Sequence, residues 1–224
     1  GQDSEEQGYT TDATETSSIK AQSFTEADLQ YDNKLNAVGV LYSGVWNKSL
    51  HDITYDNSVN VKGKSKLTTM DRKQDITLAA YDKSKVEFNT IADSGYGLAA
   101  SAYGRTYADF ARNAKINIEQ DSKLDSAYNT YINAGGDLNG INSSLNYTIN
   151  SEAYNRSLIP AGTSGRFENN MTQNNQANIA GDITSVHNVY LNATGGSDTV
   201  KQISKEYMIY TGKQTDEEVT TVLP

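Results

Sequence analysis

Short runs of alternating apolar and polar residues recur along the middle of the chain. The clearest examples span residues 76–80, 86–90 and 145–149. A period of two over four to eight residues indicates a half-buried β-strand. Gly, Asn, Asp and Ser separate the runs, as turns require, and Asn139-Gly140 is typical of a tight hairpin turn.

This pattern predicts an all-β fold in which short antiparallel strands and hairpins form a sandwich or meander. A β-solenoid is the alternative, because similar Ser-Lys turns begin at Ser65, Ser84 and Ser122, at separations of 19 and 38 residues. Coils of about 19 residues would explain that spacing. A fourth Ser-Lys pair at Ser204 does not fit it, which favours the sandwich or meander.

One region does not follow the alternation. Residues 98–112 are rich in Ala, and several apolar side chains recur there near helical spacing. Gly104 weakens a helix by about 1 kcal/mol relative to Ala. We expect one short helix within 98–112.

The two ends of the chain are more polar than its middle. Residues 1–24 carry several acidic side chains and predict a mobile or strand-exchanging arm. Residues 213–224 predict a C-terminal tail, and residues 25–212 lie between as one β-rich domain. The chain begins at Gly1 without Met, which suggests either a removed signal peptide or a tag remnant. We expect a secreted or cell-surface location.

Composition limits the functions that the chain can have. Only 36% of residues are hydrophobic and the net charge is −9, so the core is thin and the surface polar. The absence of Cys excludes disulfides, thiolate metal sites and thiol nucleophiles. The acidic pI near 4.7 argues against a nucleic-acid partner. No apolar run reaches the roughly 18 residues of a membrane helix, so no membrane span is expected.

The sequence offers little catalytic equipment. Its two histidines are His51 and His187, and no serine lies in the spacing of a nucleophile elbow. Phosphate-binding loops, zinc-protease motifs and dinucleotide fingerprints are also missing from the sequence. These observations predict a protein that is not an enzyme and has no dedicated cofactor.

Two weaker sites are suggested by local patterns. Gly pairs precede the oxygen ligands Asp137, Asn139 and Asp198, an arrangement that could bind calcium or form two ordinary turns. Trp46, with Tyr42 nearby, could be an exposed platform that stacks on a sugar ligand, although a sole Trp in an apolar run usually belongs to the core.

The leading functional hypothesis is a structural subunit of an extracellular fibre, pilus-like filament or biofilm matrix. Its partners would be other copies of the same chain, joined by β-strand addition. The alternative is a monomeric adhesin or glycan-binding module that recognises a glycan or host surface. The candidate donor-strand residues are Ile19, Phe24, Val219, Val222 and Leu223.

Overall fold

The computed structural model describes residues 13–15, 18–209 and 212–223, which contain strands and no helix. The all-β expectation is confirmed. The strands are β1 (Ala13–Glu15), β2 (Ile19–Ala37), β3 (Tyr42–Val61), β4 (Lys66–Thr69), β5 (Ile76–Ile118), β6 (Lys123–Ser126), β7 (Thr130–Ala134), β8 (Ser144–Ile179), β9 (Asp182–Ser185), β10 (Val189–Ala193), β11 (Ser197–Met208) and β12 (Lys213–Leu223).

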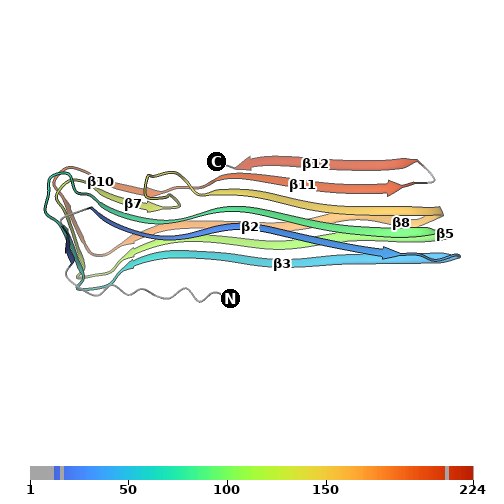
Figure 1. Cartoon of the computed structure of the whole chain (residues 1–224), viewed down its shortest axis with the longest axis horizontal. Coiled ribbons are helices and arrows are strands. Elements are labelled where there is room, and N and C mark those ends of the chain that lie inside the picture. The colour runs from blue at the N-terminus through green and yellow to red at the C-terminus, as the bar shows by residue number, and fades with distance from the viewer. Residues whose placement is uncertain (1–12, 16–17, 210–211, 224) are drawn as a thin grey trace.

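The chain winds into stacked coils of nearly constant length. Ile19 pairs in parallel with Ile76, and Asn60 bonds to Asn117, in each case 57 residues further on. β5 and β8 each run to one end of the molecule and back, so each supplies two antiparallel halves of a coil (Figure 1). We call this end the tip. The opposite end, where the short strands β1, β4, β6 and β9 stack in parallel, is the base.

The strand pairing differs from the short antiparallel hairpins that the sequence suggested. The strands are long, and the described strands pair in parallel except for β11 with β12. Ser65 and Ser122 precede β4 and β6, one coil apart, whereas Ser84 lies within β5. The repeat is therefore one coil, offset by 57 residues from the first coil to the second, which is three times the 19-residue spacing, and by between 53 and 61 residues in the later coils. The two facing layers resemble a sandwich, and the repeating offset resembles a solenoid.

Two layers of strands enclose a core that becomes narrower toward the tip. Layer A holds β2, residues 76–94, residues 144–155, β11 and β12, and layer B holds β3, residues 99–118 and residues 159–179. Branched aliphatic side chains such as Ile76 and Ile116 fill the core near the base, and Phe88, Phe110 and Tyr147 fill its middle. Near the tip the buried residues are small, mostly Ala, Ser and Thr.

This narrowing explains why the expected helix in 98–112 is wrong. Those residues belong to β5, where Ala100, Ala102 and Ala108 point inward and are buried. Alanine is abundant there because the layers lie close together, so its small volume matters more than its helix propensity.

The strands of layer B lie opposite the grooves between strands of layer A. The Asn47 side chain of β3 donates to the carbonyls of both Asn33 in β2 and Ile91 in β5, at 2.9 and 2.8 Å. One coil further on, a Cβ at Gly104 would contact the carbonyls of both Thr90 and Glu152. The two layers are thus staggered by half a strand spacing.

Similar side chains stack along the outer faces. Asn178 donates to Asn117 and Asn117 to Asn60, at 2.8 and 2.7 Å. Tyr154 stacks on Tyr207 with ring centroids 4.8 Å apart. Asparagine ladders and stacked aromatic rings stabilise parallel, in-register strands, so the coils are held by side chains as well as by backbone pairing.

Both chain ends contribute strands to the body where the structure describes them. Residues 19–24, assigned to the arm, form the start of β2, and residues 1–12 and 16–17 lie outside the described part. Residues 213–223, assigned to a tail, form β12 and pair with β11 throughout. The tail therefore belongs to the same sheet as the body.

The close approach of the layers can be tested at Gly104. A Cβ there would lie 2.4 Å from the Glu152 carbonyl oxygen, a backbone atom in the opposite layer. We expect Gly104→Ala to lower the free energy of unfolding by about 1–3 kcal/mol in urea denaturation, because neither layer can move without disturbing its pairing.

Gly44→Ala is the matched control. A Cβ at Gly44 would point to the outer face, where its nearest neighbour is the Ser101 Oγ at 3.2 Å. Equal unfolding midpoints for the two variants would contradict the close contact at Gly104.

Candidate functional site

The first coil leaves two long strand edges open at one end of the stack. Among the described residues, β2 and β3 each pair with β5 alone, so one edge of each strand has no strand partner. An unpaired edge presents a row of backbone N–H and C=O groups that another strand can bind. These two edges form the candidate functional site, which we call the first-coil end.

Apolar side chains of the interior reach the surface at the first-coil end. Leu29, Tyr31 and Leu35 share the inward parity of β2, yet they are 39%, 47% and 46% exposed. The equivalent positions one coil later, Val86 and Phe88, are buried. The exposure arises because no described coil lies beyond β2 and β3.

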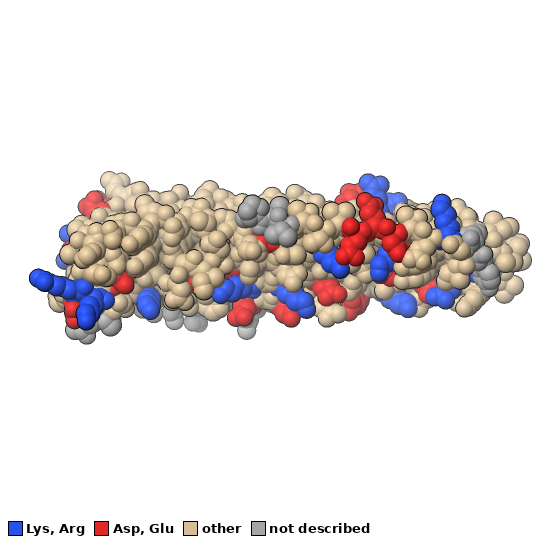
Figure 2. All heavy atoms as spheres, turned by 90° about the horizontal axis from the view of Figure 1, so that it is seen from above, with Lys and Arg blue, Asp and Glu red and all other residues tan. Residues whose placement is uncertain are grey.

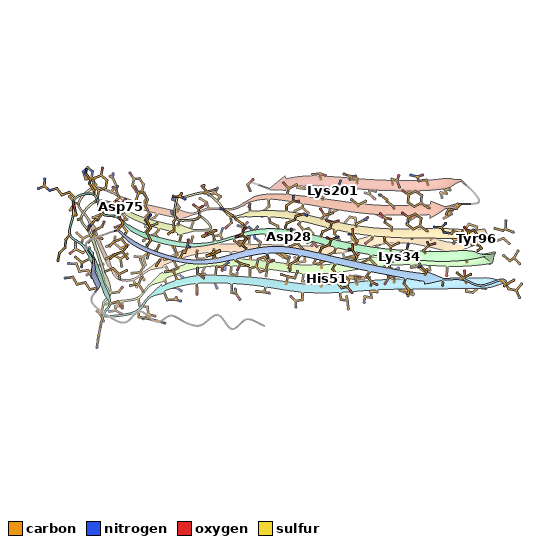
Figure 3. The ribbon with its side chains drawn as sticks, in the orientation of Figure 1. Asp28, Lys34, His51, Asp75, Tyr96 and Lys201 are labelled. Carbon is orange, nitrogen blue, oxygen red and sulfur yellow. The ribbon has the colours of Figure 1, made fainter. Side chains whose placement is uncertain are left out.

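The charged residues of β2 do not obstruct this edge. Asp28 and Asp32 lie on the outer face, toward the neighbouring strand β5, where Lys85 approaches Asp28 at 4.0 Å and Asn89 donates to Asp32 at 2.7 Å. Figure 3 shows Asp28 and Lys34 along β2. Charged side chains are a common protection against edge pairing, but here they leave the interior row uncovered.

His51 lies in the interior of the first coil. Its ring stacks on Phe88 at 3.8 Å and meets the edge of Tyr31 at 4.8 Å. Burial lowers the pKa of the imidazole, so the fold favours its neutral form. With one aromatic ring stacked on it and a second in edge contact, the His51 ring acts as a packing residue of the first coil.

At the opposite end of the stack the hairpin of β11 and β12 ends layer A, whereas in layer B residues 159–179 of β8 pair with β5 alone among the described residues. β12 exposes Asp216, Glu217 and Glu218, and Glu218 forms a 2.8 Å ion pair with Lys201 of β11. Seen from above, acidic side chains gather over this strand (Figure 2). An acidic, antiparallel edge strand resists further pairing, so the two ends of the stack differ in chemistry.

The predicted donor-strand residues all lie in strands of their own chain. Ile19 and Phe24 pair with Ile76 and Tyr81 through β2, and Val219 pairs with Gln202 through β12. Val222 and Leu223 continue the pairing of β12 with β11. The structure therefore separates these residues between the two ends of the stack, and only Ile19 and Phe24 belong to the first-coil end.

Trp46 lies on the outer face rather than in the core. It is 62% exposed, packs near Tyr103 at 5.7 Å between ring centroids, and has the Arg105 guanidinium 5.2 Å from its ring. Tyr42 lies on the same face, with its hydroxyl 3.0 Å from the Ser101 Oγ. The structure thus brings both predicted ligand-binding residues to the surface and adds Tyr103 and Arg105, which the sequence interpretation missed.

The carboxylates predicted to bind calcium have protein partners. Asp137 accepts the N–H groups of Asn139 and Ile141 at 2.8 and 2.9 Å, while Lys83 approaches at 3.5 Å. Burial raises the pKa of Asp137, but these donors outweigh it and hold the pKa below its ordinary value. Asn139 contributes its backbone to this turn. Calcium binding stays a prediction, and the described residues contain no group of three His, Asp or Glu side chains placed to hold a metal.

Asp198 belongs to a buried ionic cluster that the sequence interpretation did not find. Arg112 donates to Asp82 at 2.8 Å and to Asp198 at 2.5 Å, and all three side chains are almost fully buried. Burial raises the pKa of the Asp82 carboxyl, against the opposing effect of Arg112. The cluster ties β5 to the start of β11 through the interior.

Comparisons with protein-family models, curated proteins and solved structures found no match for this chain. Among the described residues, no helix is long and apolar enough to cross a membrane.

The ionic cluster predicts a large effect of removing its cation. We expect Arg112→Met to destabilise the fold by about 3–5 kcal/mol in urea denaturation, because it leaves Asp82 and Asp198 buried without a counter-charge. The triple variant Asp82→Asn, Arg112→Met, Asp198→Asn removes every charge and should lose much less stability. A loss below about 1 kcal/mol for Arg112→Met alone would contradict the cluster's role.

Proposed function

We propose that the protein is a structural subunit of an extracellular fibre, pilus-like filament or biofilm matrix, and that copies join through strand pairing at the first-coil end. The observation that supports this most is the pair of open edges, β2 and β3, beside the exposed interior row of Leu29, Tyr31 and Leu35. Pairing with another copy would bury this row and use both rows of backbone groups.

The half-strand stagger favours one symmetry for this contact. Because β3 lies opposite the groove between β2 and β5, β2 protrudes at the first-coil end. A two-fold axis parallel to the strands places β3 of the second copy beside β2 of the first. It also places β2 of the second copy beside β3 of the first. The offsets then cancel, and both layers pair at the ordinary strand spacing of about 4.8 Å.

The alternative two-fold axis, perpendicular to the layers, fits less well. It would pair β2 with β2 of the second copy and leave the two β3 strands about one strand spacing too far apart. The favoured contact uses the same surface on both copies and is closed. Growth into a filament would need a second contact, elsewhere on the molecule, and the hairpin of β11 and β12 lies at the opposite end of the stack.

A second candidate function is a monomeric adhesin or glycan-binding module of a cell surface. The specific observation in its favour is the outer-face position of the exposed Trp46 beside the half-buried Tyr103, since an aromatic pair next to Arg105 can stack on and hydrogen-bond a sugar ring. Such a module would need no contact between copies.

Self-association tests the first proposal. We expect light scattering coupled to gel filtration to show dimers or larger species, and Leu29→Lys to shift them to monomers because it places a charge in the paired interface. Val219→Lys is the matched control, since Val219 is 42% exposed on β12 and Leu29 is 39% exposed on β2.

Circular dichroism of both variants would show that the fold is retained. A wild-type protein that stays monomeric at high concentration would contradict assembly and favour the second candidate. Equal effects of the two substitutions would show that association does not use the first-coil end.

A further inference from the structure

The turns at the tip expose large apolar side chains from successive coils. Val40 and Leu41 in the first turn are 88% and 73% exposed, and Tyr96 in the second is 61% exposed. Leu158 and Ile159 in the third turn are similarly exposed. Figure 3 shows Tyr96 at this extremity of the molecule. Contiguous exposed apolar side chains usually mark an interaction surface.

The chain at the tip is free of charge and its backbone is partly paired. Segments 35–47, 94–104 and 157–165 contain no charged residue. The N–H groups of Leu98 and Ala99 donate to the carbonyls of Val40 and Leu41 in the preceding turn, at 3.2 and 3.1 Å. Paired backbone groups lower the cost of entering an apolar medium.

The charges nearest the tip are mostly basic. The first charged residues on either side of these three turns and of the turn between β11 and β12 comprise six cations and two anions, whereas the whole chain has 19 basic and 28 acidic residues. Asp93 and Arg156 form an ion pair at 2.9 Å and cancel each other, so five cations and one anion remain. The six cations are Lys34, Lys48, Arg105, Arg156, Arg166 and Lys213.

Three of these cations form a row across layer B. Lys48 pairs with Arg105, and Arg105 with Arg166, in the strand register, so like charges lie on adjacent strands. Their repulsion is partly offset, because Arg166 forms a 3.1 Å ion pair with Glu168, and Lys48 and Arg105 lie over the rings of Tyr107 and Trp46. Trp46 and Tyr103 lie between this row and the apolar turns, two residues closer to the tip.

We propose that the tip binds a lipid surface that contains anionic headgroups. The order from the tip is apolar turns, then Trp46 and Tyr103, then Lys48, Arg105 and Arg166. That order matches hydrocarbon, interface and headgroup phosphate in a bilayer leaflet. A second copy is a poorer occupant, because a tip-to-tip contact would bring the two cationic rows together. This inference does not depend on assembly through the first-coil end.

Vesicle flotation of the full chain tests the inference. We expect the protein to float with vesicles of equal parts phosphatidylcholine and phosphatidylglycerol, and weakly with phosphatidylcholine alone. Trp46 is the sole Trp, so its emission should shift to the blue with the anionic vesicles. Leu41→Asp and Leu158→Asp should each lower the partition coefficient about tenfold or more, and Lys48→Gln about fivefold.

Val186→Asp is the control, because Val186 is 72% exposed near the base and Leu41 is 73% exposed at the tip. It should bind like the wild type. Absence of flotation with both vesicle types, or equal losses for Leu41→Asp and Val186→Asp, would overturn the inference. If Leu41→Asp instead abolishes self-association measured without lipid, the tip binds a second copy and the lipid assignment is wrong.

Discussion

Parallel, in-register stacking of successive coils is the constraint on which the rest of the structure depends. Because each strand lies beside its counterpart about one coil away, similar positions form continuous rows along the stack. The asparagine row through Asn60, Asn117 and Asn178 shows this directly. The same constraint explains the thin core, since each coil adds only one row of inward side chains per strand, and the layers can approach closely where those side chains are small.

The stacking also gives the molecule distinct ends with different chemistry. The first coil has no described neighbour on one side and so exposes Leu29 and Tyr31, while the last strand, β12, is acidic. The tip and the base, which lie at the two ends of the long strands, also differ from each other. A two-fold axis parallel to the strands would join two first coils and keep both apolar tips on the same side, so the two proposed contacts are geometrically compatible.

The fold class could be predicted from the sequence because apolar and polar residues alternate in almost every strand. Parallel pairing could not, because the alternation of a strand is the same whichever direction its neighbour runs. The sequence of the Ala-rich part of β5 resembled that of a helix. Alanine is favoured in helices, and its small side chain also fits the narrow space between the two layers. Trp46 lies on the same face of its strand as the charged Lys48 and on the opposite face from the buried Val45. This alternation could have shown from the sequence that Trp46 faces outward. Arg112 has the inward parity of Phe110 and Ala114, and only its carboxylate partners, distant in sequence, explain its burial.

The central claim is most directly tested by a distance between two coils. Spin labels at Cys introduced in place of Asn60 and Asn178, in a chain without native Cys, report on strands two spacings apart. Parallel in-register stacking predicts strongly coupled labels, with backbones about 10 Å apart. A broad distribution centred well beyond that separation would contradict the stacking.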